Sequence, residues 1–358
     1  MSITEQPLPG YLVVTDHLEA NTGADLSDAL QRIIDENPHR TIYFPDGEYT
    51  LTKPICTPAD PAHAVSLVLS DFATIKAADS WTDTEALIRL GGKEPYNTIE
   101  INGSNYGIRG GIIDGNHLAN GISVDSGRET LISHVSIKHT QVGIHIKFGA
   151  NSGSSDADIE EVNIVGNNMP DSIGVLLEGY DNTAHNMRIA AVQTGILLRS
   201  GGNSLRDIHP LFIFGGAPRN HIPALYDGRE YAIDFKKSIG FDDQSHQNNW
   251  YSYCYSDQMA TGFRLLGGAT PVYQHCFALW YAPGDMEIGF DCVGGKFCAI
   301  VDNMNISFRR DSSGRRFLQV SEPGGLGVIQ NPIFDPTLCE DGEDGYPAYL
   351  SGRVVHGM

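Results

Sequence analysis

Charged side chains recur at one position of a short repeated motif, and their types are those that acid–base catalysis on sugars needs. The motif begins with a small residue, usually glycine, followed by alternating aliphatic residues, as in GISVDS at Gly121 and GIHIKF at Gly143. Four places after each start stand, in order, Asp125, Lys147, Glu178, Arg199 and Lys236. If successive copies stack in register, these residues form one outward charged row.

Paired carboxylates in such a row fit glycoside hydrolysis. That reaction needs one carboxylic acid to protonate the leaving oxygen and a second carboxylate as base or nucleophile, about 5–9.5 Å away. Asp125 and Asp234 each lie two copies from Glu178, and adjacent strands lie about 4.8 Å apart. We therefore predict Glu178 as one catalytic residue and Asp234 or Asp125 as the other.

The cations of the row and a second row beside it are predicted to bind substrate. Lys147, Arg199 and Lys236 would hold a carboxylate ionised or contact a charged sugar. The second row, two places after each start, reads Ser123, His145, Leu176, Leu197, Asp234, Arg264 and Asp291. In it, His145 is expected to share a proton and Arg264 to contact substrate.

Two other interpretations of the charged row stay open. Neighbours of alternating sign, such as Lys147, Glu178 and Arg199, would also form a plain ladder of ion pairs. The same residues permit a polysaccharide lyase, in which Lys or Arg removes the proton beside a uronate carboxylate. We find no clear acidic cluster for calcium on the row and predict no metal or other cofactor.

The elements that must position these residues begin with one helix and two extended runs. Helical spacing of apolar residues predicts a short amphipathic helix that contains Leu26, Ala29, Leu30, Ile33 and Ile34. TIYFPDGEYTLTKPI follows from Thr41, and it predicts two strands around a Pro-Asp-Gly turn with Ile42 and Phe44 on one side.

This region resembles a known entry segment. GADLSDALQRIIDENPHRTIYFPDGEYTL, from Gly23, is similar to the start of the pectate-lyase-like superfamily, in which a capping helix closes a right-handed β-helix. The resemblance implies the fold more than the reaction, because hydrolases, lyases, epimerases, fructosyl transferases and phage tailspikes share it. GIHIKF also resembles the GxRIK strand of polygalacturonases, with Lys147 in the Lys position but His145 where Arg is expected. Neither a paired-Asp strand nor Gly-His-Gly is found, so that mechanism is not carried over.

The repeated strand predicts a solenoid. Its seven copies are GISVDS at Gly121, GIHIKF at Gly143, GVLLEG at Gly174, GILLRS at Gly195, AIDFKK at Ala232, GFRLLG at Gly262 and GFDCVG at Gly289. The fold class predicted is all-β, a single-stranded right-handed parallel β-helix with a short N-terminal capping helix. One domain is expected over residues 1–358, with the cap at about 20–40, coils at about 41–310 and a C-terminal tail at about 311–358.

Cysteines and aromatic residues repeat within the coils. Cys254, Cys276 and Cys298 are spaced 22 residues apart and are predicted to be buried, reduced thiols. If they point inward, the residues expected to point outward are Tyr251, Tyr253 and Tyr255, then Tyr273, His275 and Phe277, and then Phe297. Such a surface fits a subunit interface, a sugar-binding platform to which the three tyrosines at 251–255 belong, or packing under the tail.

Two loops supply further candidates. HPLFIFGGAPRNHIPALYDGRE, from His209, predicts an insertion that walls a binding cleft. FDDQSHQNNW, from Phe241, adds Asp242, Asp243 and His246 as a second choice for the carboxylate site, with Asp243 predicted to contact substrate. A solvated turn is the alternative for this segment. Asp114 in GGIIDGN is predicted to form a turn.

Charge narrows the choice of partners. A net charge of −20 argues against nucleic acid and anionic membranes, and no apolar run approaches the roughly 20 residues that span a bilayer. The start lacks a signal peptide, which predicts a cytoplasmic protein or one that is leader-trimmed, secreted or virion-associated. We predict a carbohydrate-active enzyme, a glycoside hydrolase acting on a poly- or oligosaccharide. The alternatives are a polysaccharide lyase and a non-catalytic glycan-binding or tailspike-like protein, and a homo-oligomer is expected, a trimer by analogy with tailspikes.

Overall fold

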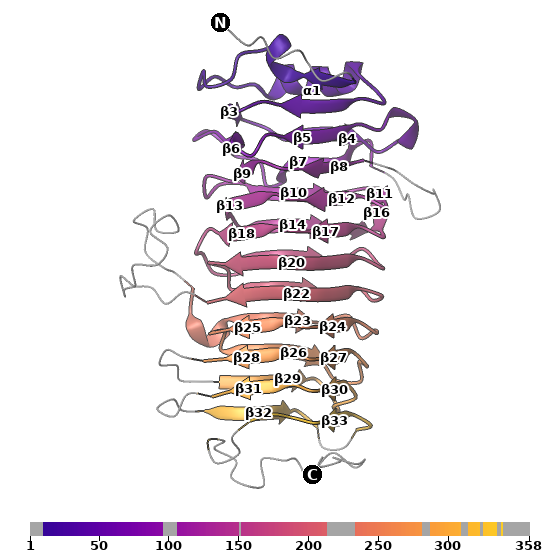
Figure 1. Cartoon of the computed structure of the whole chain (residues 1–358), viewed down its shortest axis with the longest axis vertical. Coiled ribbons are helices and arrows are strands. Elements are labelled where there is room, and N and C mark those ends of the chain that lie inside the picture. Colours follow the sequence, from indigo (N-terminus) through magenta and orange to yellow (C-terminus); the bar gives the residue numbers. More distant parts are fainter. Residues whose placement is uncertain are drawn as a thin grey trace, which may run out of the picture. The chain divides into compact units, whose positions relative to one another are not determined.

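The computed structural model describes residues 10–95, 106–149, 152–212, 233–280, 287–308, 314–322, 325–334 and 338. The chain divides into two compact units, one of residues 1–140 and 144–163 and the other of residues 141–143 and 164–358. In each unit, short parallel strands are stacked as successive rungs (Figure 1). This arrangement confirms the predicted fold class, an all-β parallel β-helix with one helix at its N-terminal end.

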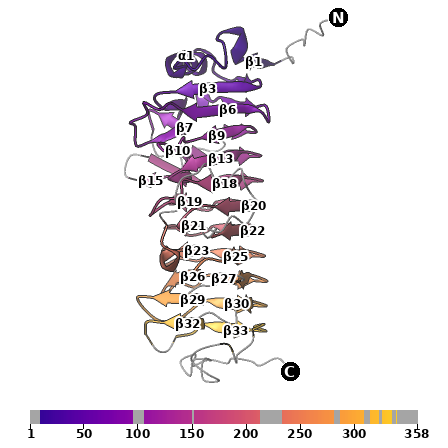
Figure 2. The same ribbon diagram turned by 90° about the vertical axis from the view of Figure 1, so that its left-hand side faces the viewer.

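The helix of the first unit forms where the apolar residues recur at helical spacing. It is α1 (Ser27–Glu36), the one α-helix among the described residues, and its Leu30 and Ile34 are each 1% exposed. Figure 2 shows α1 lying over β3 (Gly47–Leu51), the strand that begins after the Pro-Asp-Gly turn. The capping helix and the two extended runs predicted around that turn are therefore confirmed.

Coils of the first unit place one strand each on three parallel ladders. The first ladder is β1 (Tyr11–Val13), β2 (Thr41–Phe44), β5 (Ser66–Leu69), β8 (Gly107–Arg109), β12 (Leu131–Ser133) and β17 (Asp158–Glu160). The second is β3, β6 (Ala73–Ala77), β9 (Ile112–Asp114) and β13 (Ser136–Thr140). The third is β4 (Ile55–Pro58), β7 (Ala86–Lys93), β10 (Asn120–Val124) and β14 (Val142–Ile146).

This unit also contains several short elements outside the three ladders. They are the 3-10 helices η1 (Val14–Asp16) and η2 (Pro61–His63), and the small strands β11 (Gly127–Arg128), β15 (Phe148–Gly149) and β16 (Ser152–Ser155). β15 and β16 pair antiparallel, and β11 joins β16, so a small sheet follows directly on the end of β14. β18 (Asn163–Gly166) begins at the last residue of this unit.

Coils of the second unit repeat the pattern. One ladder is β19 (Ile173–Leu177), β21 (Thr194–Leu198), β23 (Ile239–Asp243), β26 (Thr261–Leu266), β29 (Glu287–Val293) and β32 (Arg315–Val320). A long pair, β20 (Thr183–Ala190) and β22 (Ser204–Leu211), leads into two shorter ladders. These are β24 (Trp250–Ser252), β27 (Val272–Gln274), β30 (Ile300–Asp302) and β33 (Val328–Gln330), and β25 (Tyr255–Asp257), β28 (Phe277–Leu279) and β31 (Asn305–Ser307).

The predicted inward facing of the repeated strand holds in both units, whereas Ser123, Leu176 and Leu197, predicted in an outward row, are buried as well. Residues one and three places after the starting glycine, such as Ile122 and Val124 in β10 or Phe263 and Leu265 in β26, are at most 1% exposed. Inside the second unit, Phe263 stacks on the equivalent Phe of β23 at a centroid distance of 4.9 Å. Burial of these aliphatic and aromatic stacks stabilises the coils by about 1.5–3 kcal/mol per large side chain.

One predicted copy of the strand is wrong. AIDFKK starts at Ala232, outside the described residues, and its next part forms the 3-10 helix η4 (Phe235–Lys237), which Asp234 caps by accepting a hydrogen bond from the backbone N–H of Lys236 at 3.1 Å. The strand of this coil is β23, with sequence IGFDD. Both segments alternate apolar and polar residues, and only the path of the chain decides which one joins the ladder. The coils also continue past residue 310, through β32 and β33.

The alternation of inward-facing and outward-facing side chains is interrupted at the corners between strands. Tyr253 adopts the left-handed backbone conformation (φ +54°) between β24 and β25, which interrupts the alternation of side chains. Tyr251 and Cys254 are therefore both buried, at 1% and 0% exposure. The outward position predicted for Tyr251 is wrong, as are those predicted for two further residues, Tyr273 and Phe297. Cys254 and Cys276 are buried free thiols as predicted, whereas Cys298 is only partly buried.

Candidate functional site

In the first unit, a compact ion cluster covers the outer side of the ladder β7–β10–β14. Asp125 follows β10 directly and is only 2% exposed. Arg89 of β7 donates to Asp125 Oδ2 from Nε at 2.9 Å and from Nη2 at 2.5 Å, and Lys147 Nζ lies 3.3 Å from Oδ1. Glu85 closes the cluster, with its Oε2 2.5 Å from Lys147 Nζ. The structure thus brings predicted Asp125 and Lys147 together.

The second row is also formed in this unit. Arg89, Ser123 and His145 are direct neighbours across β7, β10 and β14. Ser123 is buried, and its hydroxyl donates to Asp125 Oδ1 at 2.5 Å. All oxygens of Asp125 are therefore engaged, which makes this carboxylate a fixed anion at the centre of the cluster.

In the second unit, Glu178 and Arg199 form the predicted row. Arg199 Nη1 donates to Glu178 Oε1 at 2.9 Å, and the side chains are 51% and 25% exposed, respectively. On the same two strands, Leu176 and Leu197 of the second row are buried. The two charged side chains lie at the ends of β19 and β21, where they are open to solvent.

A second charged column lies farther along the same ladder of this unit. Its members are direct neighbours across β23, β26, β29 and β32, namely Asp242, Arg264, Asp291 and Gln319. Arg264 donates from Nε to Asp242 Oδ1 at 2.8 Å and from Nη2 to Oδ2. Gln244 Nε2 donates to the same Oδ2 at 2.8 Å. Asp242 is therefore paired with Arg264 at both oxygens, and it is only 2% exposed.

Asp291, on the other side of Arg264, lies in a different electrostatic environment. Desolvation by burial raises the pKa of Asp291 above its usual value of 3.8, and the negative charge of Asp242 adds to this rise. A hydrogen bond from Gln319 Nε2 at 3.1 Å and the charge of Arg264 oppose the rise without cancelling it. The column therefore holds one carboxyl group whose pKa is raised by burial and one carboxylate that is ion-paired with an arginine.

Arg264 supplies the positive charge of this column. Its strand, β26, lies between β23, which carries Asp242, and β29, which carries Asp291, and its guanidinium forms hydrogen bonds with both oxygens of Asp242. Burial lowers the pKa of Arg264, and the hydrogen bond and charge of Asp242 outweigh that effect, so the pKa lies above its ordinary value. Neutralisation of Asp242 by Arg264 leaves this carboxylate a poor ligand for a metal ion.

Other predicted site residues lie elsewhere. Asp234 and Lys236 belong to the η4 turn and not to the strand column. Asp243 is fully buried and accepts hydrogen bonds from Asn249 Nδ2 at 3.0 Å and from Tyr251 Oη at 2.9 Å. The predicted substrate contacts of Asp243 and Tyr251 are therefore corrected to interior positions. Burial and the charge of Asp243 raise the pKa of Tyr251 well above 10.

The remaining tyrosines belong to stacked aromatic pairs on the outer face. Tyr255 stacks between His209 and Phe277, with ring centroids 4.2 and 5.0 Å apart, and Tyr253 stacks on His275 at 5.2 Å. A sugar ring binds to the face of an aromatic ring, and here neighbouring rings cover those faces. This geometry favours packing over a sugar platform for Tyr255. The insertion after His209 lies mainly outside the described residues.

Sequence reasoning missed two members of these clusters. Arg89 lies in ALIRL and Glu85 directly precedes it, and this segment lacks the starting glycine of the other copies, although its alternation was a usable signal. Asp242 was predicted only as a second choice for the carboxylate site, because the strand of its coil was sought in AIDFKK. Among the described residues, no helix is long and apolar enough to cross a membrane.

Comparisons with known proteins place the fold. No family model and no curated protein sequence matches the chain. Among solved structures, it is similar to the tailspike protein of E. coli bacteriophage HK620 (11% identity, TM-score 0.58, 91% of this chain and 63% of that chain). It is also similar to the catalytic unit of a GH87 alpha-1,3-glucanase from Streptomyces thermodiastaticus (12%, 0.55, 94% and 66%) and to a family 28 exopolygalacturonase from Yersinia enterocolitica (11%, 0.51, 91% and 71%).

These neighbours are pectate-lyase-like right-handed β-helix proteins, as the entry segment implied. The chain spans less than two thirds of the tailspike chain and 66% of the glucanase chain. At 11–12% identity the likeness establishes the fold and leaves the reaction to be argued from the site itself.

Proposed function

We propose that this chain is a carbohydrate-active enzyme, a glycoside hydrolase whose catalytic carboxyl groups are Asp291 and Asp242. The observation that carries the proposal is the opposed environment of these two groups on one outer column. Burial raises the pKa of Asp291, whereas Asp242 is ion-paired with Arg264 and accepts a hydrogen bond from Gln244. A carboxyl group with a raised pKa on the same column as an ion-paired carboxylate suits the acid and base roles.

Hydrolysis by this pair balances as a single displacement. Asp291 gives its proton to the glycosidic oxygen while the bond from that oxygen to the anomeric carbon breaks. Asp242 takes a proton from a water molecule whose oxygen attacks the anomeric carbon from the opposite face. Asp242 Oδ1 accepts only Arg264 Nε among the described residues, and a carboxylate oxygen has room for a second donor. Asp242 then releases its proton to solvent, and Asp291 takes one back from solvent.

Strand spacing supports inversion of configuration. Asp242 and Asp291 lie two strands apart, which is about 9.6 Å between Cα atoms. Carboxyl groups about 6.5–9.5 Å apart leave space for the attacking water, and this is the arrangement of inverting glycosidases. The similar solved structures support a glycan substrate, because they include an alpha-1,3-glucanase and an exopolygalacturonase.

Glu178 and Asp125, which the sequence predicted as catalytic, are proposed instead to belong to substrate-binding surfaces. Glu178 and Arg199, with side chains 25% and 51% exposed at the ends of their strands in the second unit, are proposed to contact a polysaccharide. Asp125, Lys147 and His145 form the equivalent surface of the first unit. A lyase is less well supported there, because Lys147 forms two ion pairs and would have to break both to act as a base.

A screen of plant, microbial and fructan polysaccharides for released oligosaccharides tests the proposal. We expect reducing ends to appear on one class of substrate, with loss of activity in Asp291→Asn and Asp242→Asn and full activity in Asp302→Asn, a control on the separate β30 ladder. Products that absorb in the near ultraviolet would identify a lyase instead. Binding without any product would identify a glycan-binding or tailspike-like protein.

Self-association is a further part of the proposal. Trp250 and Ile300 share one outer column with Val272, and Trp250 and Ile300 are 47% and 45% exposed. Tyr253, at 53%, stands beside them. Exposed apolar side chains in a row favour a subunit interface, and we propose a trimer. Light scattering of the full chain should give three times the mass of one chain, and a monodisperse monomer would refute this assignment.

A further inference from the structure

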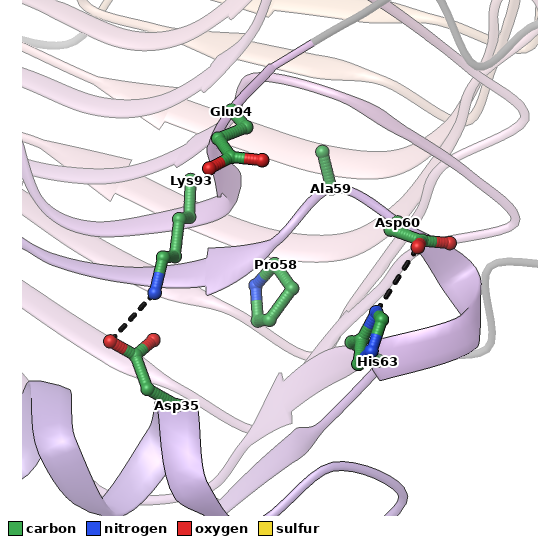
Figure 3. A pocket seen from close by; sticks show the side chains of 7 residues that line it. All are labelled: Asp35, Pro58, Ala59, Asp60, His63, Lys93 and Glu94. Atoms are coloured by element: carbon green, nitrogen blue, oxygen red, sulfur yellow. Dashed lines mark hydrogen bonds and ion pairs between the residues drawn. The ribbon is translucent and has the colours of Figure 1, made fainter.

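A pocket in the first unit lies at the end of β7, the strand that also carries Arg89 of the ion cluster. It has a volume of about 540 Å³ and is lined by Asp35, Pro58, Ala59, Asp60, His63, Lys93 and Glu94 (Figure 3). The lining residues come from the end of α1, the end of β4, the turn η2 and the end of β7. A volume of this size suits a ligand of one or two sugar rings.

Most polar groups of the pocket wall are fixed before any ligand arrives. Lys93 Nζ lies 2.7 Å from Asp35 Oδ2, and Gln31 Nε2 donates to the other oxygen of Asp35 at 3.0 Å. Asp60 accepts the backbone N–H of Ala62 at 2.9 Å and pairs with His63 Nδ1 at 3.1 Å. A wall held in this way loses little conformational entropy when it binds.

Glu94 differs from the other wall residues. In the part of the chain that the structure describes, its carboxylate has no hydrogen bond or ion pair, and Figure 3 shows it next to Lys93, across the pocket from the Asp60–His63 pair. The wall as a whole carries three carboxylate side chains, one lysine and one histidine. The pocket therefore has an excess of negative charge and one carboxylate without a described partner.

The floor of the pocket is apolar. Pro58 lies at its centre in Figure 3, between the two ion pairs, and Ala59 lies beside it. The backbone here is fixed by the pairing of β4 with β7, and the Ala59 N–H donates to the Lys93 carbonyl at 3.1 Å. A rim of hydrogen-bonding groups around an apolar floor matches a pyranose ring, which has hydroxyls at its edge and C–H groups on its faces.

We infer that this pocket binds a sugar carrying a free amino group, with the ammonium ion paired to Glu94 and the ring resting on Pro58. Lys93 and His63 donate hydrogen bonds to oxygens of the sugar hydroxyls, and Asp60 accepts a hydrogen bond from a sugar hydroxyl. Neutral sugars make the same hydroxyl contacts without the ion pair. Discrimination between the two classes is therefore expected to come from Glu94.

Calorimetric titration of the full chain with glucosamine, N-acetylglucosamine and glucose tests this inference. Glucosamine should bind at least about tenfold more tightly than the other two sugars, and Glu94→Gln should remove that preference, a change of about 1.4 kcal/mol. Asp60→Asn should weaken binding as well, because it removes a wall charge while an amide oxygen can still cap η2. Glu19→Gln, an exposed change outside the pocket, should bind like the parent chain.

Three results would overturn the inference. They are the absence of glucosamine binding, equal affinity for glucosamine and glucose, and unchanged binding in a folded Glu94→Gln variant. Circular dichroism checks the fold of each variant, and rising salt should weaken glucosamine binding selectively. Because the readout is binding in the first unit, its outcome is separate from hydrolysis at Asp242 and Asp291.

Discussion

Arg264 of β26 forms two hydrogen bonds with the carboxylate of Asp242 on the neighbouring strand β23. Its Nε lies 2.8 Å from Oδ1, and its Nη2 donates to Oδ2. The carboxylate side chain is 3% exposed and that of arginine 31%. Removal of the guanidinium would leave a buried anion with only Gln244 as a neutral donor. This pair therefore has consequences for stability as well as for the proposed reaction.

Arg264→Gln should lower the free energy of unfolding by about 2–3 kcal/mol, somewhat below the cost of breaking a fully buried pair because Arg264 is partly exposed. Urea denaturation measures this change. Arg199→Gln is the matched control on the same ladder, and its exposed pair with Glu178 should contribute about 0–1 kcal/mol. Equal effects of the two substitutions would contradict the role assigned to Arg264.

Asp291→Asn should abolish hydrolysis and make the protein slightly more stable at neutral pH. Because burial raises the pKa of Asp291 in the folded chain, its protonated form favours folding below pH 3.8, and that contribution is lost as pH rises through the raised pKa. Asparagine cannot ionise, so the variant escapes this loss. Thermal unfolding of both proteins across a pH series should show their difference growing with pH, and a constant difference would argue against a raised pKa.

Asp25→Asn should loosen the attachment of α1. The pKa of Asp25 is lowered to about 2: burial raises it, and hydrogen bonds from Ser27 and Thr52 lower it by more. The ionised carboxylate therefore stabilises the fold above pH 3.8, and this contribution disappears as pH falls from 3.8 towards 2. Since Asp25 is exposed, we expect a loss of about 1 kcal/mol at neutral pH, discounted for screening by solvent. Urea titrations should find no difference between the variant and the parent at low pH.

Asn203→Ala should be among the most destabilising polar substitutions in the second unit. Asn203 is fully buried and links Asn182 to Asn249, accepting from Asn182 Nδ2 at 2.9 Å and donating to Asn249 Oδ1 at 3.0 Å. Alanine would leave buried amide groups without partners, at a cost of about 2–3 kcal/mol. Gln274→Ala, on an exposed position of β27, serves as the control and should change stability by less than about 0.5 kcal/mol. Equal shifts of the denaturant midpoint in the two variants would contradict a stabilising role for the buried Asn182–Asn203–Asn249 hydrogen bonds.

Local features of the chain were predictable wherever a local rule decides the structure. The helical spacing of Leu30 and Ile34 predicted α1, and the alternation in GISVDS and GFRLLG predicted which side chains face inward. The charges at Asp125 and Lys147 were placed on one outer surface, where the structure pairs them. Such patterns survive folding because a helix repeats every 3.6 residues and a strand every two.

Long-range alignment was not predictable in the same way. AIDFKK and IGFDD both alternate, and the sequence alone favoured the wrong one because the loop before them has no fixed length in a coil. The left-handed residue Tyr253 reversed the side that Tyr251 faces, and such corners depend on backbone conformation rather than residue type.

The sequence by itself therefore determined the β-helix, the capping helix and the outward placement of charge. Only the tertiary structure decided that Asp242, Arg264 and Asp291 are neighbours, because their contact requires three strands from three coils to align in register. The raised pKa of Asp291 and the ion pair of Asp242 follow from that alignment, since burial and the position of Arg264 are properties of the stacked coils.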